Sequence, residues 1–308
     1  MAKKVLIAIV GPTGIGKTRL GVALAKRHHT HVISADSRQF YKEMSIGTAV
    51  PSKAELEAVP HHFIQHKSIL EDYSVGDFEK DAIHLLETLF EQHEVVIMVG
   101  GSGLYVDAVV NGLDSFPDVD PKIRLGLNET LNTEGLNPLL QQLRTLDPNY
   151  ANRVDMQNPH RVIRALEICI GSGRPYSSFL GKRKSERFFE TMVVGLTADR
   201  KTVYERIDNR VDQMLREGLL EEARPLFPFR EKNALQTVGY KEIFQFLEGA
   251  YGLDFTVSEI KKNSRRFAKR QLTWFRKRDG VLWLDAMAPV ETNVETVSEK
   301  LLKKLKDG

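Results

Sequence analysis

The chain has almost no cysteine and no long hydrophobic run. Of its 308 residues only Cys169 is a cysteine, which excludes an internal disulfide framework and a cysteine-rich zinc module. Cys169 lies in the apolar run 165–170, so we expect its side chain to be buried. No apolar stretch approaches the ~18–20 residues that span a bilayer, and no cleavage-type leader precedes Val5. These absences predict a soluble, cytoplasmic protein without a membrane partner.

Acidic residues are absent from one long segment. The formal net charge of the whole chain is only +3, but the segment from Lys261 to Arg278 contains nine Lys or Arg and no Asp or Glu. This local excess is typical of a surface that binds an anionic polymer. A solvated basic helix face would have the same composition, so the segment alone leaves both interpretations open.

The clearest motif follows the apolar run Val5–Val10. It fits G-x-x-x-x-G-K-[ST], a loop whose backbone N–H groups bind phosphate between a buried strand and a helix. Lys17 would reach the terminal phosphate oxygens, and Thr18 would offer a hydroxyl to Mg²⁺, the cofactor that the motif implies. Such loops usually bind nucleotides, ATP above all. The predicted phosphate-binding residues are Gly11, Pro12, Thr13, Gly14, Ile15, Gly16, Lys17 and Thr18.

Polar residues follow two further predicted strands. A strand over 31–35 is followed by Asp36, and the fully apolar strand over 95–99 is followed by glycines and Ser102. In an open parallel sheet, the carboxyl ends of the strands face the ligand. Many P-loop enzymes carry an aspartate after the second of these strands to hold Mg²⁺, and this chain has none there. Asp36 and Ser102 are therefore candidate site residues.

The remaining pattern predicts an α/β fold with a P-loop NTPase-like parallel sheet core. Apolar spacing predicts a helix over 78–90, strands over 192–196 and 281–284, and a closing helix over 294–305. Asp199 is a predicted helix cap. Residues 116–190 contain no β-type segment, so we expect a mostly helical insertion, carrying the basic stretch Lys182-Arg183-Lys184, between core segments 1–115 and 191–308. His61 and His62 are adjacent, but no third ligand follows at the spacing of a metal site, so the sequence argues against a metal centre there.

Several motifs occur in an order that resembles the bacterial tRNA dimethylallyltransferases. The ordered set covers nearly the whole chain and is far more specific than the phosphate loop alone. The motifs are Gly11–Thr18, Ser34–Tyr41, Met44–Pro51, Val99–Tyr105, Asn158–Glu167, Val238–Glu242 and Ala268–Arg276.

The resemblance implies transfer of a dimethylallyl group from dimethylallyl diphosphate to N6 of adenosine 37. This adenosine lies next to the anticodon of tRNAs that read codons beginning with U. The loop would then bind the diphosphate leaving group instead of ATP, and the macromolecular partner would be the anticodon stem-loop of tRNA. We expect a monomer. A P-loop kinase of a small metabolite, an isopentenyltransferase of free adenine nucleotides and a non-enzymatic RNA-binding module are the alternatives.

The resemblance also implies roles for individual residues. Asp36 would be the general base, with an Mg²⁺ ligand or a turn cap as its alternative roles. Ser102 would bond near the reacting amine or the diphosphate, and Arg124 would contact RNA near the reaction. The residues implied in tRNA binding are Asp36, Ser37, Arg38, Gln39, His160, Arg161, Val162, Ile163, Arg164, Lys269, Arg270 and Gln271.

Two aromatic residues and two arginines are further candidates for the core or the site. We expect Trp274 and Phe275 to be core anchors and not platforms on which bases stack. Arg206 and Arg210 are one helical turn apart and would face either the diphosphate or surface acids.

Overall fold

The computed structural model describes residues 3–181 and 186–306, and the chain forms two compact units. We call Met1–Val110 with Arg187–Gly308 the core unit, and Asn111–Glu186 the insertion unit. The insertion predicted at 116–190 is shifted by a few residues at both ends. Arg187 explains the later boundary, because it bonds Glu79 Oε1 at 2.5 Å and the Ala108 carbonyl at 2.6 Å within the core unit. The stretch Lys182-Arg183-Lys184 lies outside the described residues.

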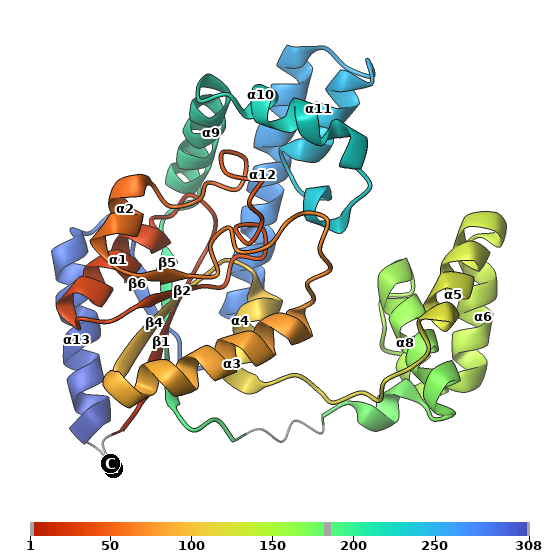
Figure 1. Ribbon diagram of the computed structural model, residues 1–308, viewed down its shortest axis with the longest axis horizontal. Helices are drawn as coiled ribbons and strands as arrows, with labels where there is room; N and C mark the ends of the chain where they lie inside the picture. Colours follow the sequence, from red (N-terminus) through yellow and green to blue (C-terminus); the bar gives the residue numbers. More distant parts are fainter. Residues whose placement is uncertain (1–2, 182–185, 307–308) are drawn as a thin grey trace. The chain divides into compact units, whose positions relative to one another are not determined.

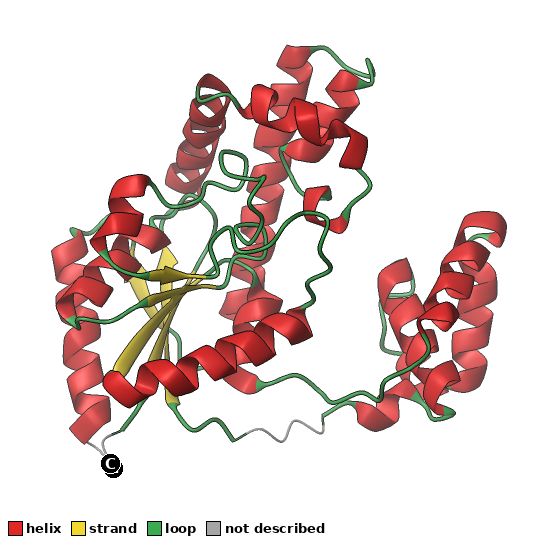
Figure 2. Cartoon of the chain, in the orientation of Figure 1, coloured by secondary structure: helices red, strands yellow, loops and turns green. Residues whose placement is uncertain are grey.

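The core unit is built on one parallel six-stranded sheet (Figures 1 and 2). The strand order is β3-β2-β4-β1-β5-β6, so the two central strands are β4 and β1. The strands are β1 (Val5–Val10), β2 (Val32–Ser34), β3 (His61–His62), β4 (Val95–Val99), β5 (Glu190–Thr197) and β6 (Leu282–Asp285). All pairings are parallel, which confirms the predicted α/β sheet. Only the two-residue β3 was not predicted, because its histidines carry no apolar strand pattern.

Both faces of the sheet are covered, which explains the continuous apolar runs in β1 and β4. Alternate residues of β1 enter opposite cores: Ile7 packs in the cluster that contains α1 and α13, and Leu6 in the cluster that contains α3. Figure 1 shows α1 and α13 along one side of the sheet and α3 along the other. All six residues of β1 are fully buried, and this fixes the start of the phosphate loop firmly in the core.

Several helices of the core unit begin at residues whose side chains cap them. Ser74 and Asp77 form a reciprocal capping box at α3, and Asp199 accepts a bond from Thr202 N at 3.0 Å at α9, as predicted. The helices are α1 (Lys17–Arg27), α2 (Lys53–Ala58), α3 (Val75–Gln92), α4 (Gly103–Asn111), α9 (Arg200–Arg216), α10 (Leu219–Ala223), α11 (Tyr240–Leu247), α12 (Leu253–Arg276) and α13 (Val290–Lys306), with 3₁₀ turns η2 (Arg224–Phe229) and η3 (Asn233–Leu235). None of the described helices is long and apolar enough to cross a membrane.

The insertion unit contains helices and loops but no strand among its described residues, as Figure 2 shows. It consists of α5 (Pro121–Glu134), α6 (Leu136–Leu146), α7 (Pro148–Ala151), α8 (Pro159–Ser172) and the 3₁₀ turn η1 (Tyr176–Phe179). The helices pack around their own small core of leucine, valine and isoleucine side chains. Cys169 is buried on α8, as expected.

Candidate active site

The phosphate loop connects β1 to α1. Gly16, immediately before α1, has φ = 101°, a left-handed conformation that favours glycine. Within residues 3–181 and 186–306, no acceptor bonds the backbone N–H groups of Gly14, Ile15 or Gly16. Unpaired N–H groups beside the start of a helix are donors for an anion. The loop therefore has the geometry of a phosphate site.

Lys17 is the first residue of α1 and is largely buried beside the loop. Its Nζ donates to the Pro12 carbonyl at 2.8 Å. Burial lowers the pKa of Lys17 to about 8; the Asp36 carboxylate opposes this shift and Arg210 adds to it. Burial also lowers the pKa of Arg210, again against the effect of Asp36. The charges of Lys17, Asp36 and Arg210 therefore interact. A bound anion would reduce the electrostatic repulsion between Lys17 and Arg210.

Asp36 and Ser102 follow adjacent strands, β2 and β4. Asp36 Oδ1 accepts a bond from Arg38 N at 3.1 Å, whereas its Oδ2 has no hydrogen-bond partner in the described structure. Ser102 Oγ accepts a bond from Ser37 N at 3.1 Å. Because β4 pairs with β2 on one side and β1 on the other, these residues and the phosphate loop follow three neighbouring strands. The sheet thus brings together the site candidates that the sequence placed at strand ends.

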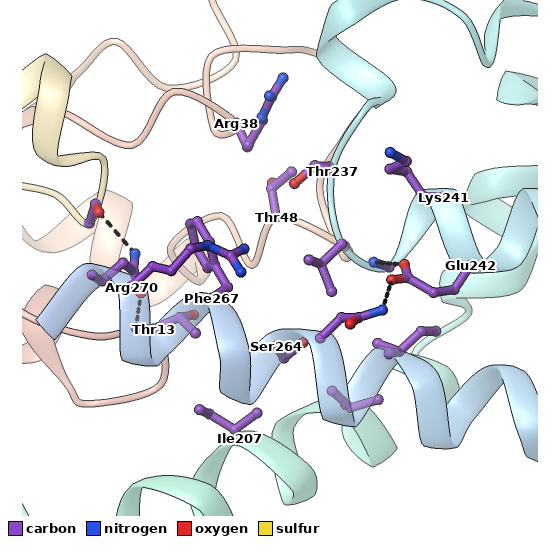
Figure 3. Close-up of a pocket in the computed structure, with 18 of the residues that line it drawn as sticks. Thr13, Arg38, Thr48, Ile207, Thr237, Lys241, Glu242, Ser264, Phe267 and Arg270 are labelled. Atoms are coloured by element: carbon purple, nitrogen blue, oxygen red, sulfur yellow. Dashed lines mark hydrogen bonds between the residues drawn. The ribbon is translucent and has the colours of Figure 1, made fainter. Parts of the chain in front are cut away.

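A cavity of about 880 Å³ opens from this edge of the sheet. Figure 3 shows Phe267 and Arg270 on α12, with Lys241 and Glu242 on α11. Predicted site residues that line the cavity are Thr13, Asp36, Ser37, Arg38, Ser102, Arg210, Arg270 and Gln271. Its size exceeds what a diphosphate fills, and its lining carries hydroxyl, aromatic and charged side chains together.

The family follows from comparison with known proteins. The IPP transferase family model matches residues 39–278, which is more than half of the chain. The chain belongs to the IPP transferase family. A tRNA dimethylallyltransferase of Christiangramia forsetii is 59% identical over 280 residues, covering 91% of this chain and 93% of the relative. One from Flavobacterium psychrophilum is 51% identical over 302 residues, covering 96% and 98%.

Solved structures agree with this assignment. The full-length tRNA isopentenylpyrophosphate transferase of Bacillus halodurans has a TM-score of 0.74 at 38% identity, covering 99% of this chain and 98% of that one. A eukaryotic dimethylallyltransferase acting on tRNA has a TM-score of 0.79 at 28% identity, covering 92% and 74%. The predicted resemblance and fold class are confirmed, and the chain is a transferase.

Mg²⁺ is the cofactor that the loop of this IPP transferase implies. Thr18 is half-buried at the second position of α1, and its hydroxyl has no hydrogen-bond partner among the described residues. No group of three or more His, Cys, Asp or Glu in residues 3–181 and 186–306 could hold a metal. Mg²⁺ often takes one or two protein ligands and completes its shell with water and substrate phosphates. One free hydroxyl beside a phosphate loop fits that pattern.

Arg38 and Gln39 use their side chains within the core unit. Arg38 Nη1 donates to the carbonyls of Asn233 (2.7 Å) and Ala234 (3.1 Å). Gln39 Nε2 donates to the Ala49 carbonyl at 2.9 Å, and its Oε1 accepts from Ser34 Oγ at 3.1 Å. Both side chains therefore hold neighbouring segments of the core unit together. Their predicted tRNA contacts stay predictions.

The residues of α12 divide between surface and interior. Lys269 and Arg270 are exposed, and Arg270 lies over the Phe267 ring at 5.6 Å. Phe275 is fully buried, as predicted, but the same prediction for Trp274 was wrong: its side chain is 44% exposed and donates to Asp107 Oδ2 at 2.8 Å. Adjacent residues of a helix point about 100° apart, so only one of the pair enters the core.

The environment of Gln271, like that of Trp274, differs from the one predicted. It was predicted to contact tRNA, but it is only 6% exposed, and both ends of its amide bond the protein's own backbone. The physical reason is that its side chain points from α12 toward the phosphate loop.

In the insertion unit, some of the residues that were predicted to bind tRNA are exposed and others are buried. His160 and Arg161 are exposed on α8, whereas Val162 and Ile163 are buried in the core of the unit. The prediction that these two side chains bind tRNA is therefore corrected, because α8 has a wide buried face and both side chains pack in the core of the unit.

Two predicted RNA-contacting arginines share one acceptor in this unit. Arg124 and Arg164 both bond Glu167 Oε2, at 3.1 and 3.0 Å, and both stay more than two-fifths exposed. A single buried carboxylate thus orients two guanidinium groups, and their roles toward RNA stay predictions.

The structure adds site residues that the sequence reasoning missed. Phe267, Thr237 and Lys241 line the cavity (Figure 3). Phe267 could have been found from the spacing of 267, 270 and 274 on one helix face. Of the two candidate arginines on α9, Arg210 lines the cavity, whereas Arg206 donates to the Ile15 carbonyl at 3.3 Å and supports the loop.

Proposed function

We propose that this IPP transferase moves a dimethylallyl group from dimethylallyl diphosphate to N6 of adenosine 37 in tRNA and releases diphosphate. The observation that carries the proposal is the position of Asp36 beside the phosphate loop, at the ends of neighbouring strands, in a chain 59% identical to a named tRNA dimethylallyltransferase. A phosphate loop with an adjacent carboxylate provides a diphosphate site and a base together.

The diphosphate binds to the loop N–H groups, with Lys17 and Arg210 neutralising its charge. As the bond between the allylic carbon and oxygen breaks, negative charge grows on the departing diphosphate. Donors already oriented toward those oxygens stabilise that charge more than they stabilise the ground state. Mg²⁺, when bound with Thr18 as one ligand, supplies further charge neutralisation at the diphosphate.

The acceptor amine needs a base because the adenine ring withdraws its lone pair. As the bond from N6 to the allylic carbon forms, Asp36 takes one amine proton on Oδ2, the oxygen without an internal partner. The electron pair of the broken bond leaves with the diphosphate. Ser102, whose Oγ bonds Ser37, fixes the turn that follows Asp36.

Exposed basic and aromatic groups support an RNA acceptor. Lys269 and Arg270 bind phosphates, and Phe267 and Trp274, which are 37% and 44% exposed, offer ring faces for unpaired bases. The adenine must leave the stack of the anticodon loop to reach Asp36. Neither a kinase nor an enzyme for free nucleotides requires this combination on one helix.

One experiment distinguishes the acceptors and donors. The purified protein is incubated with labelled dimethylallyl diphosphate or labelled ATP, together with unmodified tRNA or AMP. We expect label in tRNA only, from the prenyl donor only, at the adenosine beside the anticodon when the product is digested to nucleosides. Prenylation of AMP at the same efficiency, or labelling from ATP, would contradict the proposed function.

A further inference from the structure

Gln271 connects three segments of the core unit that are far apart in the chain. Its Oε1 accepts a bond from Thr13 N in the phosphate loop at 2.9 Å, and its Nε2 donates to the Gly101 carbonyl after β4 at 2.9 Å. The side chain is only 6% exposed. One amide therefore joins α12, the phosphate loop and the end of β4.

The chemistry of this bridge is specific to a carboxamide. Thr13 N is a donor and the Gly101 oxygen is an acceptor, so the bridging group must accept on one side and donate on the other. A carboxylate can only accept, and an aliphatic side chain can do neither. The bond to Gly101 is buried and the bond from Thr13 is part-buried, and an unpaired polar group is costly where water is excluded.

Two close approaches show how tightly the bridge is packed. A Cβ atom at Gly101 would lie 2.3 Å from Gln271 Nε2, so any side chain there would displace the amide of Gln271. The same position lies 3.6 Å from Lys17 Nζ. The bridge is thus immediately next to the lysine and one residue before Ser102.

We propose that Gln271 is a positioning residue for the diphosphate site and does not bind tRNA, although its neighbours Lys269 and Arg270 face solvent. It fixes the loop relative to β4 and so sets the distance between the loop's N–H groups and Ser102. The proposal rests on the proposed function, because it assigns the loop to the prenyl diphosphate.

Two variants test the bridge. Gln271→Leu removes both bonds, and Gln271→Glu keeps the acceptor, loses the donor and adds negative charge beside Lys17. For each we expect KM for dimethylallyl diphosphate to rise about 10-fold or more, the size expected from losing one or two hydrogen bonds. The Kd for tRNA should stay within about twofold. The Kd for inorganic diphosphate, measured without tRNA, should rise in parallel with KM.

The control is Gln213→Leu, which removes an exposed amide bond to Glu217 on α9. It should leave both substrates' constants unchanged. A tRNA Kd that rises in the Gln271 variants while the diphosphate constants stay constant would overturn the proposal. So would unchanged constants in Gln271→Glu, which also serves if Gln271→Leu fails to fold. Absence of prenyl transfer in the unaltered protein would instead contradict the proposed function.

Discussion

The hydroxyl oxygens of Ser37 and Ser102 lie 3.1 Å apart, although 65 residues separate them in the chain. Ser102 Oγ also accepts a bond from Ser37 N at 3.1 Å. Ser37 directly follows Asp36, so the end of β4 holds the turn that carries the candidate base. This contact links the two strand ends on which the proposed proton transfer depends.

Replacing Ser102 should therefore slow the reaction without abolishing substrate binding. Ser102→Ala removes a part-buried acceptor for Ser37 N, a loss of roughly 1–2 kcal/mol or about 10-fold in kcat. Ser102→Thr keeps the hydroxyl and should retain most of the activity. Steady-state kinetics of the two variants check this. Equal rates for the alanine and threonine variants would show that the hydroxyl has no role.

Asp36→Asn should separate chemistry from binding. The amide keeps the shape of the side chain but does not accept the amine proton, so kcat should fall by at least ~10²-fold, the scale of general-base catalysis. The Kd for tRNA should change by less than about threefold. A filter-binding titration alongside single-turnover rates measures both quantities. Turnover near that of the unaltered protein would remove Asp36 from the role of base.

The affinity for diphosphate should fall as pH rises through the pKa of Lys17, about 8. Below that pH the ammonium is charged and attracts the ligand, whereas above it the neutral amine attracts it less. Inorganic diphosphate also loses its last proton in the alkaline part of this range, and the added negative charge strengthens its binding to cations, so the effect of Lys17 has to be measured against a variant whose cation does not titrate. Bound diphosphate raises the pKa of Lys17, so the fall should begin somewhat above 8.

Calorimetric titration of inorganic diphosphate between pH 7 and 10 measures this dependence. Lys17→Arg provides the comparison, because a guanidinium stays protonated throughout. Its Kd should be higher at neutral pH, owing to the changed shape, and should not rise with pH, because only the ligand's own ionisation remains. A rise of Kd with pH that persists in Lys17→Arg would assign the titration to another group of the protein.

Binding of tRNA should depend on salt through the exposed cations of α12. Replacing Lys269 and Arg270 together by alanine should weaken binding and lower the slope of log K against log salt by roughly 1.4, about 0.7 for each single-strand contact. The double change Lys300→Ala and Lys303→Ala, on the exposed face of α13, removes the same charge elsewhere. Equal slopes for the two double variants would place the RNA on another surface.

The sequence predicted those features whose structure depends on residues close together in the chain. The phosphate loop, its buried strand and its helix are contiguous, and the glycines at 11, 14 and 16 supply the positive φ values that the turn requires. The strands β1 and β4 were predicted because apolar runs of this kind belong in a sheet covered on both faces. The position of Asp36 directly after a strand indicated the site, because the carboxyl ends of the strands in a parallel sheet face the ligand.

Side-chain orientation on the helices was less predictable. Trp274 and Phe275 have similar apolarity, yet one is half-exposed and the other is buried. Val162 and Ile163 lie in a motif that resembles an RNA-contacting segment, but they pack into the insertion unit. Which face of a helix turns inward depends on what packs against it, and that information lies elsewhere in the chain.

The sequence by itself determined that this protein has a phosphate loop, a parallel sheet, a helical insertion and the motifs of its family. Those features depend on residues close together in the chain or on the order of motifs along it. Only the tertiary structure decided that Gln271 joins Thr13 to Gly101, across 258 and 170 residues. Folding brings such groups together through the sheet and the packing of α12, and no local pattern records a contact between segments so far apart.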